Sequence, residues 1–297
     1  MYERFFHFTV RPFALNPDPA FLYPSRQHEA ALTMLEYAIE SQAGFCLLSG
    51  EIGCGKTTIV RRMIRSLGDR FTVGLISNAH DRFVSILPWA LSALGIASAD
   101  KSDIAQYEAL AEFVIGEYAR GRRTLLAIDE AQNLSIAVLE ELRLFSNINS
   151  EGDIALQILL VGQPELRNKL ERPELAQFAQ RVSVDFHLES LDLAEVGAYI
   201  KHRLTTAGGS ASLFQPEAVA YIHARSRGVP RLVNQLCDMS LVYAFAEQRD
   251  SVDEQLVRSV VQDRTRGHAG LFAADITLIP LPQKPSSAEP VQTSRRV

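Results

Sequence analysis

The sequence contains little cysteine: Cys46, Cys54 and Cys237 are the only three in 297 residues. An odd number at wide spacing fits neither a disulfide framework nor a structural zinc site. Proteins with so few cysteines, and no sign of pairing, are typical of a reducing compartment. We therefore expect neither disulfides nor structural zinc to stabilise this fold.

Long apolar runs are also missing. No segment reaches the roughly 18 consecutive apolar residues that a membrane-spanning helix needs. The first six residues, Met1–Phe6, lack the basic and then apolar plan of a signal peptide. These absences predict a cytoplasmic protein, for which any contact with a membrane runs through a partner.

An excess of positive charge is absent as well. Thirty Lys and Arg stand against 35 Asp and Glu, for a net charge of −5. A typical nucleic-acid binder carries a strong basic footprint, so this balance makes nucleic acid an unfavoured partner, although a local basic patch would still be compatible with it. The length and the 47% hydrophobic content are sufficient for a large core and for two domains.

A phosphate-binding loop is the strongest motif present. Residues 50–57 read Gly-Glu-Ile-Gly-Cys-Gly-Lys-Thr and fit the pattern G-x-x-x-x-G-K-[ST], between an apolar strand pattern and a helical one. The glycines let backbone N–H groups surround a phosphate, and the helix N-terminus adds partial positive charge. Lys56 is expected to reach the β- and γ-phosphates and Thr57 to ligate Mg²⁺. The alternative is an ordinary glycine-rich turn between a strand and a helix.

The predicted cofactors are therefore ATP and Mg²⁺. The residues assigned to nucleotide binding are consecutive in the sequence: Gly50, Glu51, Ile52, Gly53, Cys54, Gly55, Lys56, Thr57 and Thr58.

A second motif places two acids at the end of another strand pattern. The apolar run 124–128 is followed by Asp129 and Glu130. In a parallel sheet such residues emerge at the carboxyl edge, where ligands bind. Asp129 is the predicted second Mg²⁺ ligand, and Glu130 is the predicted base that deprotonates the attacking water. Alone, the pair would be better explained by a helix cap with a first-turn charge. Together with the phosphate loop it predicts ATP hydrolysis.

Strand and helix patterns alternate through the middle of the chain, which favours a parallel sheet between helices. The fold class expected is α/β: a P-loop AAA+ three-layer αβα core followed by a small all-helical lid. We expect an N-terminal arm rich in Phe and Pro with a first helix (1–40), the core (41–190), the lid (191–266) and a flexible tail (267–297). The predicted strands are 45–49, 72–77, 124–128, 156–161 and 182–186.

Several stretches, in order, resemble the ExeA/GspA family of secretion-associated AAA+ ATPases of Gram-negative bacteria. They are Phe-Ala-Leu-Asn-Pro-Asp-Pro (13–19), Asp-Glu-Ala-Gln-Asn-Leu (129–134), Leu-Val-Gly-Gln-Pro-Glu-Leu-Arg (160–167) and Gly-Val-Pro-Arg-Leu-Val-Asn (228–234). The resemblance runs from Tyr2 to about Asp263. The Asn-Pro-Asp-Pro arm looks closest to the subgroup of exosortase and exopolysaccharide loci, with the mannose-sensitive pilus type as the other candidate.

This resemblance implies roles for three further residues. Gln163 matches a sensor 1 position beside the γ-phosphate, with a polar turn residue as the alternative. Arg181 matches an arginine finger that acts on a neighbour's nucleotide, with a surface ion pair as the alternative and Arg172 as a rival. Arg231 matches the sensor 2 arginine of the lid, with a surface helix-terminal arginine as the alternative. A finger would require a homo-oligomer.

Other polar and aromatic residues were open to two interpretations. Asn78 follows the second strand, near where a polar residue can hold Glu130 inactive until a partner binds. Phe13 and Phe21 could contact adenine, although simple packing of the arm is preferred. His28 and His187 are interpreted as structural polar residues, and no metal site beyond Mg²⁺ is indicated.

ExeA-type proteins carry a membrane span and a peptidoglycan-binding part after the lid, whereas this chain continues into a short Pro-rich segment. The resemblance therefore implies a cytoplasmic motor or switch, peripheral to the inner membrane through partners, for an export, pilus or exopolysaccharide system. The alternative is a transposition-type AAA+ regulator that assembles on DNA with ATP. A third reading, a scaffold that binds ATP and hardly hydrolyses it, is opposed by the complete set Lys56, Thr57, Asp129 and Glu130.

Overall fold

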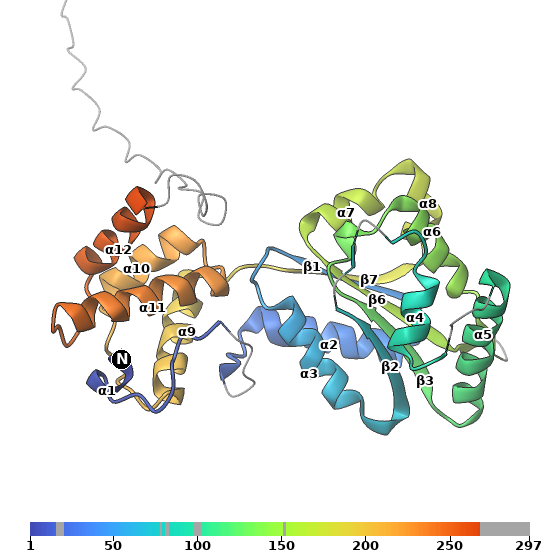
Figure 1. Cartoon of the computed structure of the whole chain (residues 1–297), viewed down its shortest axis with the longest axis horizontal. Helices are drawn as coiled ribbons and strands as arrows, with labels where there is room; N and C mark the ends of the chain where they lie inside the picture. Colours follow the sequence, from blue (N-terminus) through green and yellow to red (C-terminus); the bar gives the residue numbers. More distant parts are fainter. Residues whose placement is uncertain (16–20, 78, 81–82, 98–101, 151–152, 268–297) are drawn as a thin grey trace, which may run out of the picture. The chain divides into compact units, whose positions relative to one another are not determined.

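The structure is a computed structural model that describes residues 1–15, 21–77, 79–80, 83–97, 102–150 and 153–267. Within them the chain divides into two compact units, shown in Figure 1. One unit combines residues 1–15, 192–228 and 232–267, and the other contains residues 21–191 and 229–231. Asn78, the Asn-Pro-Asp-Pro stretch and all but the first residue of the predicted tail lie outside the described residues.

The second unit is built on a five-stranded sheet in the order β2-β3-β6-β1-β7, in which every neighbouring pair is parallel. This confirms the α/β fold class, and each predicted strand is present to within one or two residues. The strands are β1 (Phe45–Gly50), β2 (Phe71–Ile76), β3 (Arg123–Ile128), β6 (Leu156–Gly162) and β7 (Val182–Leu188).

Helices cover both faces of this sheet (Figure 1). The strand residues that face α4 to α7, among them Leu47, Leu126 and Ile158, belong to the main apolar core, and α2 and α3 pack on the other face. The helices of this unit are α2 (Arg26–Glu40), α3 (Lys56–Leu67), α4 (Leu87–Ala93), α5 (Asp103–Ala119), α6 (Ile136–Phe145), α7 (Pro164–Leu170) and α8 (Ala176–Ala179). The shorter elements are the 3₁₀ turns η2 (Gly68–Arg70), η3 (Ala131–Asn133) and η4 (Pro173–Leu175), and the strands β4 (Asn149–Ser150) and β5 (Asp153–Ile154).

The central strands of the sheet are more deeply buried than the two outer strands. Every residue of β1 and β6 is buried, as are all but the first of β3, whereas β2 and β7, at the edges, are only partly covered. Continuous apolar strands are what a parallel sheet covered on both faces requires. Because β3, β6 and β1 are parallel neighbours at the centre of the sheet, their carboxyl ends lie side by side. We call this the carboxyl edge of the sheet, and the opposite end of the strands the amino edge.

The other unit is helical. It contains α1 (Tyr2–Phe5), α9 (Leu193–Thr206), α10 (Pro216–Ser226), most of α11 (Pro230–Ala246) and α12 (Glu254–Gly267). A capping box opens α9: the Asp192 side chain accepts from the Glu195 backbone N–H, and the Glu195 side chain accepts from the Asp192 backbone N–H. None of the described helices has the length and apolar character to cross a membrane.

The N-terminal arm packs against this helical unit. Phe6, Phe8 and Phe13 are buried, and the Phe13 ring lies 5.9 Å from the ring of Phe214. Arg203 is also buried and donates hydrogen bonds to the carbonyl oxygens of Pro12 and Ala14. In this unit the aromatic side chains of the arm therefore serve packing.

Candidate active site

The loop between β1 and α3 requires glycine at two positions. Gly53 and Gly55 adopt φ values of 85° and 101°, which side chains rarely tolerate. A Cβ atom on Gly53 would lie 2.5 Å from Cβ of Arg231, and one on Gly55 would lie 2.9 Å from Nε2 of His28. Conformation and space together explain why the loop is built from glycine here.

Lys56 opens α3 and folds back over the loop. Its side chain is buried, and Nζ donates to the carbonyl oxygens of Gly50 (2.7 Å) and Glu51 (2.9 Å). Burial lowers the pKa of Lys56, and the nearby carboxylates of Glu130 and Asp129 oppose that shift. A buried ammonium held only by neutral carbonyls can exchange them for phosphate oxygens.

Thr57 and Asp129 meet directly at this edge. The Thr57 hydroxyl donates to Oδ2 of Asp129 at 2.6 Å, and the Glu130 backbone N–H donates to Oδ1 at 3.0 Å. Burial raises the pKa of Asp129, while the bond from Thr57 lowers it. A hydroxyl and a carboxylate are the hard oxygen donors that Mg²⁺ prefers. The described residues contain no cluster of three or more His, Cys, Asp or Glu side chains, so these two fit an ion that takes its other ligands from phosphate and water.

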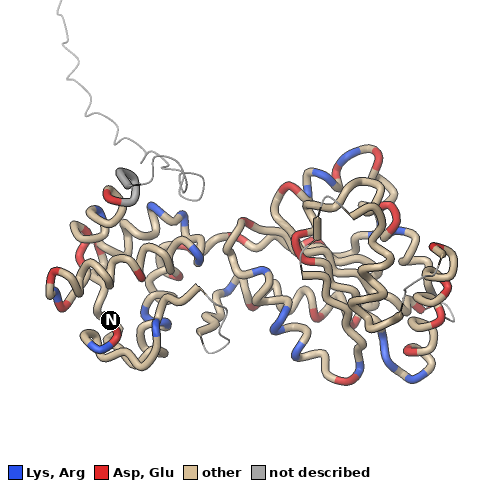
Figure 2. The backbone as a smooth tube through the Cα atoms, in the orientation of Figure 1, with Lys and Arg blue, Asp and Glu red and all other residues tan. Residues whose placement is uncertain are grey.

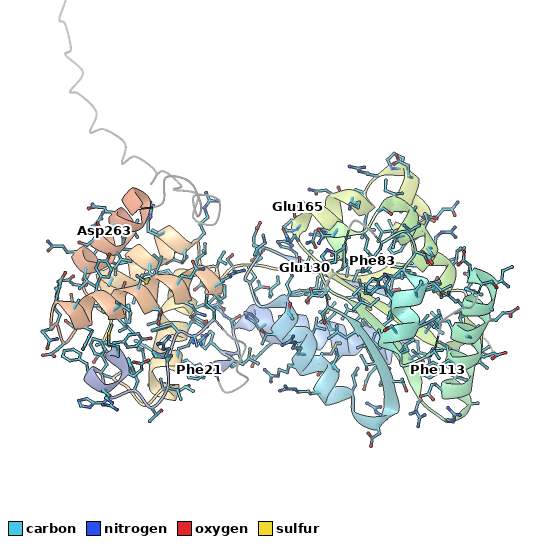
Figure 3. All side chains as sticks on the ribbon, viewed as in Figure 1. Phe21, Phe83, Phe113, Glu130, Glu165 and Asp263 are labelled. Atoms are coloured by element: carbon cyan, nitrogen blue, oxygen red, sulfur yellow. The ribbon has the colours of Figure 1, made fainter. Side chains whose placement is uncertain are left out.

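Glu130 follows immediately, in a left-handed conformation (φ 58°) at the start of η3. Figure 3 labels it at the edge of the sheet. Its Oε2 atom accepts hydrogen bonds from Nε2 of Gln132 (2.6 Å) and Nε2 of Gln163 (3.3 Å). The Gln163 backbone N–H in turn donates to Oε1 of Gln132 at 3.1 Å. The structure thus brings Gln163 beside Glu130, together with Lys56, Thr57 and Asp129.

Two further residues lie near the loop, and the sequence assigned neither of them a catalytic or binding role. Gln132 contacts both Glu130 and Gln163, and the signals for it were its place two residues after Glu130 and its position in the stretch 129–134. His28 lies close to the loop, with Nε2 3.0 Å from the Cys54 carbonyl and Nδ1 2.5 Å from Oγ of Ser25. A proton on Nε2 satisfies both contacts of a neutral imidazole, because Ser25 can then donate to Nδ1. This matches the structural interpretation given to His28.

Arg181 lies at the other end of the sheet. It immediately precedes β7, whose first residue pairs with the start of β1, so it is remote from the loop that follows β1. Its guanidinium donates to the Arg143 carbonyl (3.2 Å), Oδ1 of Asn147 (2.9 Å) and the Ser146 hydroxyl at the end of α6. Arg181 is therefore not brought to the loop of its own chain.

The two other arginines differ from each other. Arg231 is exposed near the start of α11, and its backbone N–H donates to the Gly53 carbonyl at 3.3 Å, so it borders the loop. Arg172 is exposed between α7 and η4. Figure 2 shows basic and acidic residues interspersed along both units.

Comparison of the sequence with known proteins gives a consistent result. Residues 39–170 match the family described as AAA domain. The chain is 36% identical over 247 residues to General secretion pathway protein A of Aeromonas hydrophila, a match that covers 83% of this chain and 45% of that protein. The chain thus spans about half the length of this curated relative.

Solved structures show the same fold at low identity. The ORC2 protein of Aeropyrum pernix, in its ADPNP-ADP complexes, superposes with a TM-score of 0.64 at 20% identity, over 92% of this chain and 75% of that one. Cdc6p of Pyrobaculum aerophilum gives 0.62 at 18% identity, over 89% and 75%. The RuvB motor of Thermotoga maritima gives 0.51 at 20%, over 81% and 69%.

Proposed function

Because the chain belongs to the ExeA/GspA-type AAA+ family, we propose that it binds ATP with Mg²⁺ and hydrolyses it. The observation that carries this proposal is the convergence of Lys56, Thr57, Asp129 and Glu130 on one edge of the sheet, with Thr57 and Asp129 in direct contact. We further propose that the helical residues 191–266 act as the lid of this site, with Arg231 reporting the nucleotide state.

Each side chain of the candidate active site has a separate role in the proposed hydrolysis. The loop N–H groups and Lys56 hold the phosphates, and Thr57 with Asp129 holds Mg²⁺, which when bound neutralises charge on the β- and γ-phosphates. Glu130 orients a water molecule and accepts its proton as the water oxygen bonds to the γ-phosphorus. The bond to the β–γ bridging oxygen breaks, so ADP and inorganic phosphate leave.

An oligomer is the second part of the proposal. Arg181 lies at the amino end of β7, remote from its own loop, and three acceptors at the end of α6 fix one of its guanidinium nitrogens. A guanidinium presented in this way can act on the γ-phosphate of a neighbouring copy, where its charge stabilises the transition state. We therefore propose a homo-oligomer that ATP forms or tightens.

The pathway is proposed from the relative. Its name, General secretion pathway protein A, supports a role as a cytoplasmic motor or switch for an envelope export, pilus or exopolysaccharide system, reached through partner proteins. Assembly on DNA, as in transposition regulators, is not favoured, since the net charge is −5 and the ORC and RuvB likenesses are at or below 20% identity.

One experiment tests the ATPase and the oligomer together. Hydrolysis per subunit is measured against protein concentration for the wild type, Glu130→Gln and Arg181→Ala, and Arg172→Ala tests the rival arginine in the same assay. We expect the wild-type rate to rise with concentration, and both Glu130→Gln and Arg181→Ala to lose turnover. Glu130→Gln should still bind ATP, and a mixture of the two inactive variants should recover activity.

Wild-type hydrolysis retained in Glu130→Gln would remove Glu130 from the mechanism. A rate independent of concentration and unaffected by Arg181→Ala would replace the oligomer with a self-contained switch. Addition of duplex DNA to the same assay tests the alternative, because a large stimulation that falls steeply with salt would favour assembly on DNA.

A further inference from the structure

The side chain of Gln132 uses both ends of its amide at the candidate active site. Its Nε2 donates to Oε2 of Glu130 at 2.6 Å, and its Oε1 accepts from the Gln163 backbone N–H at 3.1 Å. One amide therefore connects Glu130, the second residue after β3, with Gln163, the first residue after β6. These are neighbouring strands of the sheet, so the bridge is short and local.

Two neighbours hold Gln132 in this place. The Lys169 ammonium on α7 donates to the backbone carbonyls of Gln132 (2.5 Å) and Leu134 (2.7 Å), which fixes the turn η3. On the other side, a Cβ atom at Gly162 would lie 2.8 Å from Oε1 of Gln132, so the absence of a side chain there makes room for the amide. Backbone and side chain of Gln132 are thus both constrained.

The bridge also selects one oxygen of Glu130. Both side-chain hydrogen bonds that Glu130 accepts, from Gln132 and from Gln163, end on Oε2. Among the described residues no hydrogen-bond donor contacts Oε1, so this oxygen is the one left for a water molecule. Glu130 lies in a left-handed turn just after β3. The hydrogen bonds from the amides of Gln132 and Gln163 fix the orientation of its carboxylate.

We propose that Gln132 is a positioning residue for ATP hydrolysis: it holds Oε2 of Glu130, so that Oε1 faces the attacking water. The inference rests on the proposed function, because it assigns Gln132 to the same reaction. Gln132 itself contacts no nucleotide in this scheme. It acts on the rate of the chemical step and not on the affinity for ATP.

The test measures kcat and KM for ATP in Gln132→Ala, Gln132→Glu and Glu130→Gln, with the exposed Gln255→Ala on α12 as the matched control. We expect kcat of Gln132→Ala to fall on the order of ten- to a hundredfold, as a misplaced catalytic group does, with KM nearly unchanged. Gln132→Glu keeps the length of the side chain but donates no N–H group, so it should not restore kcat. Gln255→Ala should match the wild type.

A double-mutant cycle then separates positioning from a general loss of structure. If Gln132 acts through Glu130, Gln132→Ala should cost nothing further in single-turnover hydrolysis when Glu130→Gln is already present. Full additivity, an unchanged kcat in Gln132→Ala, or a matching loss of ATP binding would overturn the inference. The proposed function fails separately, and recognisably, if Glu130→Gln hydrolyses ATP at the wild-type rate.

Discussion

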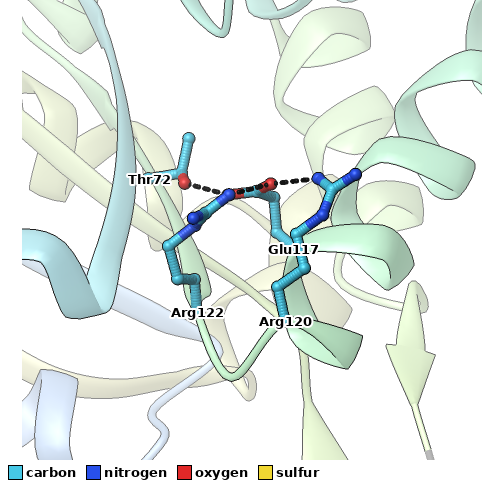
Figure 4. A network of polar contacts seen from close by, with 4 residues as sticks. All are labelled: Thr72, Glu117, Arg120 and Arg122. Carbon is cyan, nitrogen blue, oxygen red and sulfur yellow. Dashed lines mark hydrogen bonds and ion pairs between the residues drawn. The ribbon is translucent and has the colours of Figure 1, made fainter.

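A buried carboxylate lies near each end of the parallel strands, and the two carboxylates have different hydrogen-bond partners. At the carboxyl edge, Asp129 accepts from one hydroxyl and one backbone N–H, and burial raises its pKa. Near the amino edge, Glu117 of α5 accepts from Arg122, the Thr72 hydroxyl and Arg120, and these bonds lower its pKa to about 2. Figure 4 shows this second network.

The partners of the two carboxylates separate a structural acid from a functional one. Glu117 receives two guanidinium groups from its own chain, so its charge is already compensated when the protein folds. Asp129 has only neutral donors in direct contact, and its charge is available to a cation that arrives with the nucleotide. Burial is the same in both cases, with 2% of Glu117 and 7% of Asp129 exposed. The partners, and not the burial, make the distinction.

The largest effect that would test this comparison is expected from Lys56→Ala. Removing the ammonium should lower ATP affinity and turnover by about a hundredfold or more, since it supplies the charge-assisted bonds to the phosphates. Stability should hardly fall, because burial already lowers the pKa of Lys56 and so disfavours its charged form. Isothermal titration with ATP and urea unfolding measure the two quantities. The exposed Lys201→Ala is the control, and a large loss of stability in Lys56→Ala would contradict the comparison.

A smaller loss of activity is expected when a proposed Mg²⁺ ligand is removed. Thr57→Ala should slow hydrolysis about ten- to a hundredfold and raise the Mg²⁺ concentration needed for half-maximal rate, because one oxygen donor is lost. Thr57→Ser keeps the hydroxyl and should stay within about threefold of the wild type on the same grounds. A Mg²⁺ titration of the ATPase rate measures both variants. Equal behaviour of the two would mean that the hydroxyl of Thr57 is not a ligand.

At the other edge, Glu117→Ala should destabilise the protein without slowing catalysis. It leaves the Thr72 hydroxyl and two guanidinium groups without their acceptor, and because the arginines are partly solvated we expect a loss of about 2 kcal/mol in the free energy of unfolding. Urea unfolding measures this loss, and kcat taken well below the unfolding temperature should equal that of the wild type. Glu112→Ala, exposed on the same helix, is the control. A fall in kcat would make Glu117 more than structural.

Most of the candidate active site could be predicted, because its residues directly follow apolar strand patterns that are easy to recognise in the sequence. The phosphate loop, Asp129 and Glu130 each follow an apolar strand, and parallel strands bring their carboxyl ends together. The α/β fold was predicted for the same reason, since alternation is a local property. The short strands β4 and β5 were missed, because two-residue strands have no periodicity to recognise.

Contacts between side chains from distant parts of the chain could not be predicted. Thr72 and Glu117 are separated by 45 positions, and nothing in either segment indicates the other. The packing of Phe13 against Phe214 likewise depends on where the arm runs, which prolines limit but do not determine. One local contact was also beyond prediction: the bond of Gln132 to Glu130, two residues away, depends on the left-handed turn at Glu130, a conformation that few residues adopt.

The smallest expected effect is the pH dependence of the stability that Glu117 contributes near the amino edge of the sheet. The pKa of Glu117 is lowered from its ordinary value of 4.5 to about 2, first by its bond with Arg122, so between these values the unfolded chain binds more protons than the folded one. Its stabilising contribution is therefore complete above about pH 5 and is lost as the pH falls toward 2. In Glu117→Gln this contribution is absent at every pH. The difference in unfolding free energy between wild type and variant, measured by urea titration from pH 6 to pH 3, should therefore narrow as the pH falls. A constant difference would mean that the network stabilises the fold by packing and neutral hydrogen bonds, and that the contrast with Asp129 is not one of charge.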